Sequence, residues 1–108
     1  MNNLNSVLLE GQIEYACCLP IDKNGEDICM FHINSSRLFK NKNNEIKKET
    51  MSIDAVAYGV LAQKCSLEIS KDRKVSVVGR LTQYNNIFVN SDIHKMIIVA
   101  EHVEFEKD

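Results

Sequence analysis

The sequence of 108 residues predicts a mainly β fold, a small barrel of five strands that carries one short helix. Three observations lead to this prediction. Residues 50–58 alternate between two faces, which is typical of a strand with one side toward a core. Residues 61–69 carry apolar side chains at helical spacing, which predicts a three-turn helix directly after that strand. The other apolar segments are β-branched or alternating, as in strands.

The first half of the chain predicts two further strands joined by a hairpin. Residues 5–15 form the first, and Gly11 marks a bulge or bend within it. Pro20 cannot donate to a strand ladder, so this strand has ended before it. The Asn24-Gly25 pair predicts a tight turn, because both residues tolerate positive φ. Residues 27–35 form the returning strand.

The segment of residues 39–49 is rich in Asn and Lys and nearly without apolar content, so we expect a mobile loop before the central strand. After the helix, residues 71–74 predict a turn. Residues 75–84 form the fourth strand, in which Gly79 allows the sheet to curl, and residues 95–105 form the fifth.

Five strands with a helix between the third and fourth follow the order of an OB-fold, a five-stranded Greek-key barrel. Gly11 and Gly79 fit this fold, because tight barrel corners favour residues without a Cβ. Other small barrels and a plain α+β sheet share the same pattern of elements. The length predicts one domain over residues 1–108, without a linker.

Composition indicates a soluble globular protein, with 44% hydrophobic and 26% charged residues. We find no signal peptide and no membrane span, so we expect a cytoplasmic protein. The four cysteines, Cys17, Cys18, Cys29 and Cys65, form no CxxC pair, which favours reduced thiols. A zinc site would require a histidine to converge on them in space. We therefore expect no metal and no cofactor.

Charge is distributed unevenly along the chain. The net charge of −2 argues against a protein that coats nucleic acid through bulk charge alone. Two basic groups nevertheless flank the central strand: Arg37, Lys40, Lys42, Lys47 and Lys48 before it, and Lys71, Arg73, Lys74 and Arg80 after it. Such groups are often ordinary solvated surface, but their pairing around one strand favours a polyanionic ligand.

Three segments, in the expected order, resemble bacterial single-stranded DNA-binding proteins. They are NSVLLEG at residues 5–11, DAVAYGVLA at residues 54–62 and VVGRL at residues 77–81, and the resemblance extends over residues 4–105. It implies an OB-fold that binds single-stranded DNA without sequence preference in replication, recombination or repair, in the nucleoid. It also implies a homo-oligomer, a tetramer rather than a dimer. The chemistry would be base stacking on aromatic side chains beside a cationic groove.

The resemblance extends to some of the family's stacking positions and not to others. Phe39 and Tyr58 match them in kind, whereas Ser52 and Asn86 stand where the family usually has aromatics, and Tyr84 compensates in part. The predicted nucleic-acid site consists of Phe39, Tyr58, Tyr84, Arg37, Lys40, Lys42, Lys47, Lys48, Arg73, Lys74 and Arg80. Each aromatic could instead pack at the barrel rim. Asp54 shares a face with Tyr58 and would oppose phosphate binding.

Family members continue into a flexible linker and an acidic tip that recruits replication and repair proteins. This sequence stops soon after its fifth strand, so we expect such partners only if a tail is missing. No histidine pairs with a nucleophile or carboxylate in a catalytic pattern, which predicts a non-enzyme. The lost aromatics leave an alternative, a degenerate OB-fold module that binds protein, and a third hypothesis is an RNA-binding barrel.

Overall fold

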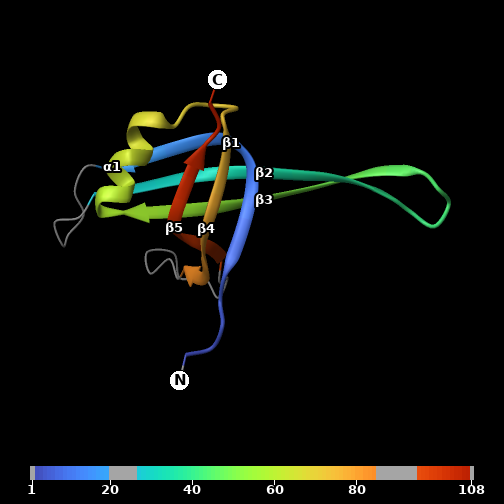
Figure 1. Ribbon diagram of the computed structural model, residues 1–108, viewed down its shortest axis with the longest axis horizontal. Helices are drawn as coiled ribbons and strands as arrows, with labels where there is room; N and C mark the ends of the chain where they lie inside the picture. The colour runs from blue at the N-terminus through green and yellow to red at the C-terminus, as the bar shows by residue number, and fades with distance from the viewer. Residues whose placement is uncertain (1, 20–26, 85–94, 108) are drawn as a thin grey trace.

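A computed structural model describes residues 2–19, 27–84 and 95–107. Its elements are β1 (Val7–Leu19), β2 (Ile28–Lys40), β3 (Ile46–Tyr58), α1 (Gly59–Glu68), β4 (Lys74–Tyr84) and β5 (Lys95–Phe105). The strands close into a barrel in the order β1-β2-β3-β5-β4 (Figure 1). Neighbouring strands are antiparallel except β3 and β5, which are parallel. This arrangement confirms the predicted five-stranded barrel with its helix between the third and fourth strands.

Strand β1 closes the barrel by pairing with two partners in turn. Its first half pairs with β4, from Val7 opposite Gly79 to Gln12 opposite Lys74, and its second half pairs with β2. The change of partner occurs at Gln12, next to Gly11, where a Cβ atom would collide with the backbone carbonyl of Asn34. Gly11 therefore stands where the β1 and β2 backbones approach closely. The bulge lies slightly later, as a register shift between residues 13 and 15.

The core fills the barrel and is covered at one end by α1. Its largest fully buried side chains include Phe31 and Ile33 of β2, which alternate with more exposed neighbours as the sequence predicts. The helix turns Ala62 and Cys65 toward this core and packs against β2, β3 and β5 (Figure 1). The short helix thus closes one end of the barrel.

The prediction of a mobile loop over residues 39–49 is wrong. Strands β2 and β3 remain paired as far as Lys40 opposite Ile46, and they project from the barrel as a long two-stranded arm (Figure 1). The turn is closed by the backbone N–H of Asn41, which donates to the backbone carbonyl of Glu45 at 3.0 Å. Asn44 adopts a φ of 61°. Apolar residues are few here because a ribbon outside the barrel has no core to face.

The expectation that all four thiols are reduced is also wrong for one pair. Register places Cys18 directly opposite Cys29, with their Cα atoms 4.0 Å apart, and a disulfide joins them. Cys17 is exposed and Cys65 is buried. No helix among the described residues is long and apolar enough to cross a membrane. The predicted Asn24-Gly25 turn lies outside the described residues.

Candidate nucleic-acid interface

The β2–β3 ribbon has two faces, and they divide the predicted binding residues. Cross-strand partners such as Leu38 and Lys48 are both even-numbered, so even residues share one face and odd residues the other. Inside the barrel the odd face is the core face, since Phe31 and Ala55 are fully buried. The even face is the outer surface of the barrel. In the arm, side chains of both faces are exposed.

The odd face of the arm carries three predicted residues, Arg37, Phe39 and Lys47, which we call the arm cluster. The Arg37 guanidinium lies 5.5 Å from the centre of the Phe39 ring, and Lys47 is the cross-strand partner of Phe39. Carboxylates partly neutralise the two cations: Glu49 lies 3.7 Å from Arg37, and Glu45 lies 3.2 Å from Lys47. An exposed ring flanked by cations suits base stacking next to phosphate contacts.

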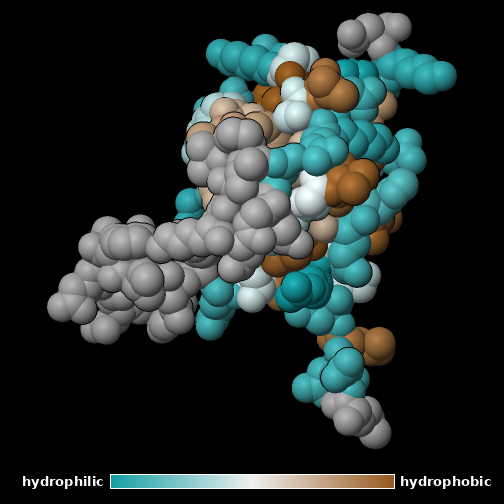
Figure 2. Space-filling model, turned by 90° about the vertical axis from the view of Figure 1, so that its left-hand side faces the viewer, coloured by the Kyte–Doolittle hydropathy of each residue, from teal (hydrophilic) through white to brown (hydrophobic). Residues whose placement is uncertain are grey.

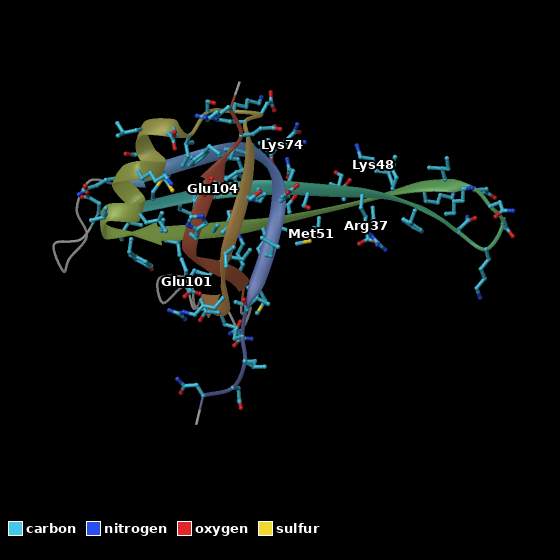
Figure 3. All side chains as sticks on the ribbon, in the orientation of Figure 1. Arg37, Lys48, Met51, Lys74, Glu101 and Glu104 are labelled. Carbon is cyan, nitrogen blue, oxygen red and sulfur yellow. A yellow bond between two sulfur atoms is a disulfide. The ribbon has the colours of Figure 1, made fainter. Side chains whose placement is uncertain are left out.

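The outer face contains a groove at the base of the arm, which we call the base groove. It is lined by Glu10, Gly11, Gln12, Asn34, Ser36, Lys48 and Lys74. Lys48 and Lys74, both predicted site residues, meet here although they lie far apart in the sequence, and Figure 3 shows them on the same side of the molecule, opposite Arg37. Ammonium, amide and hydroxyl donors are the groups that contact phosphates in protein–DNA interfaces.

Next to the base groove, the outer face carries a hydrogen-bonded network around Asp54. The Lys95 ammonium donates to Asp54 Oδ2 at 2.6 Å, and His32 Nδ1 lies 2.7 Å from Asp54 Oδ1. Burial acts to raise the pKa of Asp54, but the hydrogen bonds and charges of Lys95 and His32 outweigh it and lower the pKa below 3.8. Asp54 is only 8% exposed. The negative charge of Asp54 is therefore compensated by Lys95 and His32, which reduces the repulsion of phosphate expected from the sequence.

This network continues toward the groove through amide and hydroxyl groups. Ser52 Oγ donates to Asn34 Oδ1 at 2.6 Å, and Asn34 Nδ2 donates to Glu14 Oε2 at 3.2 Å. Asn34 thus belongs to both the network and the base groove. Asn34 and Lys95 are not among the residues predicted from the sequence. Their alternation within their strands indicates a face, but only the strand register shows which residues they meet.

Tyr58 and Arg73 differ in how free their side chains are. Tyr58 ends β3 on the outer face, is 43% exposed, and its side chain makes no capping hydrogen bond to α1. The Arg73 guanidinium instead donates to the carbonyls of Glu68 at 2.8 Å and Glu106 at 3.2 Å, and it lies 5.2 Å from the Phe105 ring. Arg73 therefore fastens the end of α1 to the end of β5.

The remaining predicted residues are not gathered into either cluster. Lys40 and Lys42 lie at the tip of the arm, and Arg80 lies toward the opposite end of β4 from Lys74. Tyr84 ends β4, paired with Lys95, and its side chain lies outside the described part of the structure, as does Asn86.

One exposed aromatic residue received no role in the sequence analysis. Tyr15 of β1 is 59% exposed, and its ring stacks on His32 with centroids 4.7 Å apart and planes 3° apart. The cross-strand pairing of Tyr15 with His32 produces this contact. Only the bulge after Ile13 places both rings on the outer face, and a bulge of that kind cannot be located from a single sequence.

The closed five-stranded barrel with its helix between β3 and β4 defines an OB-fold protein. The chain belongs to the single-strand binding protein family, whose model matches residues 4–106. It is 30% identical over 100 residues to the single-stranded DNA-binding protein of Aquifex aeolicus (strain VF5), covering 93% of this chain and 68% of that protein.

Solved structures share the fold at lower identity. The single-stranded DNA-binding protein of Plasmodium falciparum, in complex with single-stranded DNA, has a TM-score of 0.85 and 19% identity, with 99% of this chain and 98% of that chain covered. A deletion mutant of the Thermus aquaticus single-stranded DNA-binding protein has a TM-score of 0.84 and 16% identity. The match covers 96% of this chain and 51% of that one, so this chain spans about half its length.

Proposed function

We propose that this protein binds single-stranded DNA without sequence preference during DNA replication, recombination or repair. Membership of the single-strand binding protein family carries this proposal. The Aquifex relative is named for the same ligand, and the Plasmodium structure of the same fold holds single-stranded DNA. The protein is a binding protein and not an enzyme. Its place of action is the cytoplasm, at nucleoid DNA that has become single-stranded.

The binding surface has two parts on opposite faces of the β2–β3 ribbon, so a DNA strand that contacts both must cross an edge of the arm. In the arm cluster, Phe39 offers a ring for stacking between Arg37 and Lys47. In the base groove, Lys48 and Lys74 offer ammonium groups for phosphates. Stacking and phosphate contacts are both tolerant of base identity, which accounts for binding without sequence preference.

Other predicted residues have supporting roles in this proposal. Tyr58 would extend the surface at the far end of β3, and Tyr84 and Arg80 would contribute along β4. Lys40 and Lys42 would add charge at the arm tip. We do not assign DNA contacts to Arg73, because its guanidinium already serves the Glu68 and Glu106 carbonyls.

The test is a titration of oligothymidine at a series of salt concentrations. Each phosphate neutralised should contribute about −0.7 to the slope of log K against log salt. Replacing both Lys48 and Lys74 by Ala should flatten this slope by more than 1. A matched control is Lys64→Ala, because the Lys64 ammonium bonds the Val103 carbonyl of β5, away from the groove.

Three outcomes separate the hypotheses. A flattened slope in the double variant alone supports the proposed surface. An equal slope in all three proteins means that the base groove is not a phosphate site. If wild-type protein at about 100 μM does not bind oligothymidine, only an association weaker than this concentration could have been missed. That result contradicts DNA binding and favours the protein-binding module. A parallel titration with oligouridine compares RNA with DNA.

A further inference from the structure

We propose that Tyr15, stacked on His32, is an additional nucleobase platform on the outer face of β1, β2 and β3. This inference rests on the proposed function and adds a site to it. Tyr15 is one of the most exposed aromatic residues in the described structure, at 59%. One face of its ring is covered by His32, with the planes 3° apart, and the other face is available to a base.

The Tyr15 platform is fixed from below by a chain of polar contacts. His32 is held at Nδ1 by Asp54, 2.7 Å away, while its Nε2 lies 3.5 Å from Glu14. Asp54 is held in turn by the Lys95 ammonium at 2.6 Å. The His32 side chain is only 16% exposed, so it acts as a fixed base for the Tyr15 ring. A ring that is already ordered loses little conformational freedom when a base stacks on it.

The position of Tyr15 connects the surfaces already described. Register places Tyr15 opposite His32 and His32 opposite Asp54, while Asn34 and Ser52 form the next row on the same face. The base groove begins in that next row, at Asn34. In the other direction, Tyr58 lies four residues beyond Asp54 along β3, about 13 Å away at 3.3 Å per residue. A DNA strand that crosses from the base groove to Tyr58 therefore crosses the row formed by Tyr15, His32 and Asp54.

Local chemistry also favours a base at this point. Ser52 provides no aromatic surface on the central strand β3. Tyr15 provides an aromatic ring on the same face, on β1, which is two strands away. The carboxylate of Asp54 is compensated by Lys95, as described above. Glu14 is the remaining acid, and its carboxylate accepts a hydrogen bond from Asn34 beside its contact with His32. The occupant is a nucleobase of a single strand, recognised by its π-face and not by its edge.

The experiment compares wild type, Tyr15→Ala and Tyr15→Phe against oligothymidine and an abasic oligonucleotide of equal length. If Tyr15 stacks on a base, Tyr15→Ala should bind oligothymidine about tenfold more weakly and Tyr15→Phe should bind as wild type. The abasic strand has phosphates but no bases, so all three proteins should bind it equally. Thermal midpoints show whether each variant is folded.

A second measurement needs no variant. On addition of oligothymidine to the wild-type protein, the ring protons of Tyr15 should shift upfield in the NMR spectrum, because a stacked base imposes its ring current on them. Unchanged Tyr15 signals would overturn the inference, as would an equal loss of affinity for both oligonucleotides in Tyr15→Ala. If the wild-type protein binds no oligothymidine, the proposed function itself fails. If it binds oligothymidine but Tyr15 is not involved, only the inference about Tyr15 fails.

Discussion

Asp54 is a carboxylate whose effect depends on its neighbours more than on its own charge. It lies on the outer face of the barrel, where an unpaired acid would repel phosphates. Lys95 and His32 both contact it, and they keep its pKa below the ordinary value despite its burial. The pKa of Lys95 is raised by the same hydrogen bond. The three side chains form one unit that neutralises the face and orients His32.

We predict that Asp54→Asn destabilises the folded protein. Despite its burial, the pKa of this carboxylate is held below its ordinary value of 3.8 by Lys95 and His32. The ionised carboxylate therefore stabilises the fold above that pH, and this effect is lost as pH falls through the folded pKa. At pH 5 to 8, Asp54→Asn should lower the free energy of unfolding by about 1–3 kcal/mol. Urea denaturation at several pH values measures this.

The control for Asp54→Asn is Glu104→Gln. Glu104 also contacts a histidine, His102 at 2.8 Å, but both side chains are more than half exposed. Its replacement should change the free energy of unfolding by less than about 0.5 kcal/mol. The difference between wild type and Asp54→Asn should shrink below pH 3.8, where the wild-type carboxylate becomes protonated. A difference that does not shrink as the pH is lowered would show that the amide disturbs packing and not charge.

The two-stranded arm is the element that most distinguishes this molecule from a plain barrel. Its backbone is fully paired from the barrel to the turn, while its side chains lie outside the core. An arm of this kind can be changed at single positions with little effect on the stability of the barrel. It offers a direct comparison of its two faces, because Leu38 and Phe39 are adjacent, exposed and point to opposite sides.

We therefore predict that Phe39→Ala weakens oligothymidine binding about tenfold, whereas Leu38→Ala changes it less than twofold. Loss of the Phe39 ring removes a stacking surface beside Arg37, whereas Leu38, which lies opposite Lys48 on the face of the base groove, has no ring on which a base could stack. Fluorescence anisotropy with a labelled oligonucleotide measures both affinities. Thermal midpoints should match wild type for both variants. Equal affinity losses would mean that the arm binds through general apolar contact and not through stacking.

The sequence predicted the barrel better than it predicted the arm or the site. Alternation in residues 50–58 and the helical spacing after Gly59 report on burial, and burial is what organises the barrel. The arm has no buried face, so its strands carry no alternating apolar signal and residues 39–49 were interpreted as a loop. Charge clustering identified Lys48 and Lys74 but not their convergence, which depends on the partner change of β1 at Gln12.

The stacked pair Tyr15 and His32 shows a second limit of the sequence. Both residues are visible in the sequence, but their contact depends on a bulge that shifts the β1–β2 register. Arg73 shows a related limit, since its charge favours a phosphate contact, whereas its guanidinium already donates to the carbonyls of Glu68 and Glu106. Charge and residue type predict what a side chain can bind, whereas register decides what it does bind.

The barrel is closed, but the first half of β1 has one edge without a strand partner among the described residues. From Val7 to Gly11 it is paired only with β4, within the part of the chain that the structure describes, and Asn5 continues this attachment through hydrogen bonds to Leu81. Leu4 and Leu8 are strongly exposed beside this edge. Figure 2 shows the segment before β1 extending away from the barrel, with apolar surface on it. An open, partly apolar edge strand is a template for another strand.

We predict that a second copy of the chain occupies this edge through its own β1, giving a dimer that assembles further into a tetramer. A symmetric contact of this type places the same strand on both sides of a two-fold axis. Sedimentation or light scattering at about 10–100 μM should therefore show an oligomer. Leu8→Lys should shift the protein toward monomer, because an added charge on an edge strand opposes pairing. Leu67→Lys is the matched control, since Leu67 is also strongly exposed but belongs to α1 and not to the β1 edge. A wild-type monomer at these concentrations, or equal dissociation by both variants, would contradict assembly through β1.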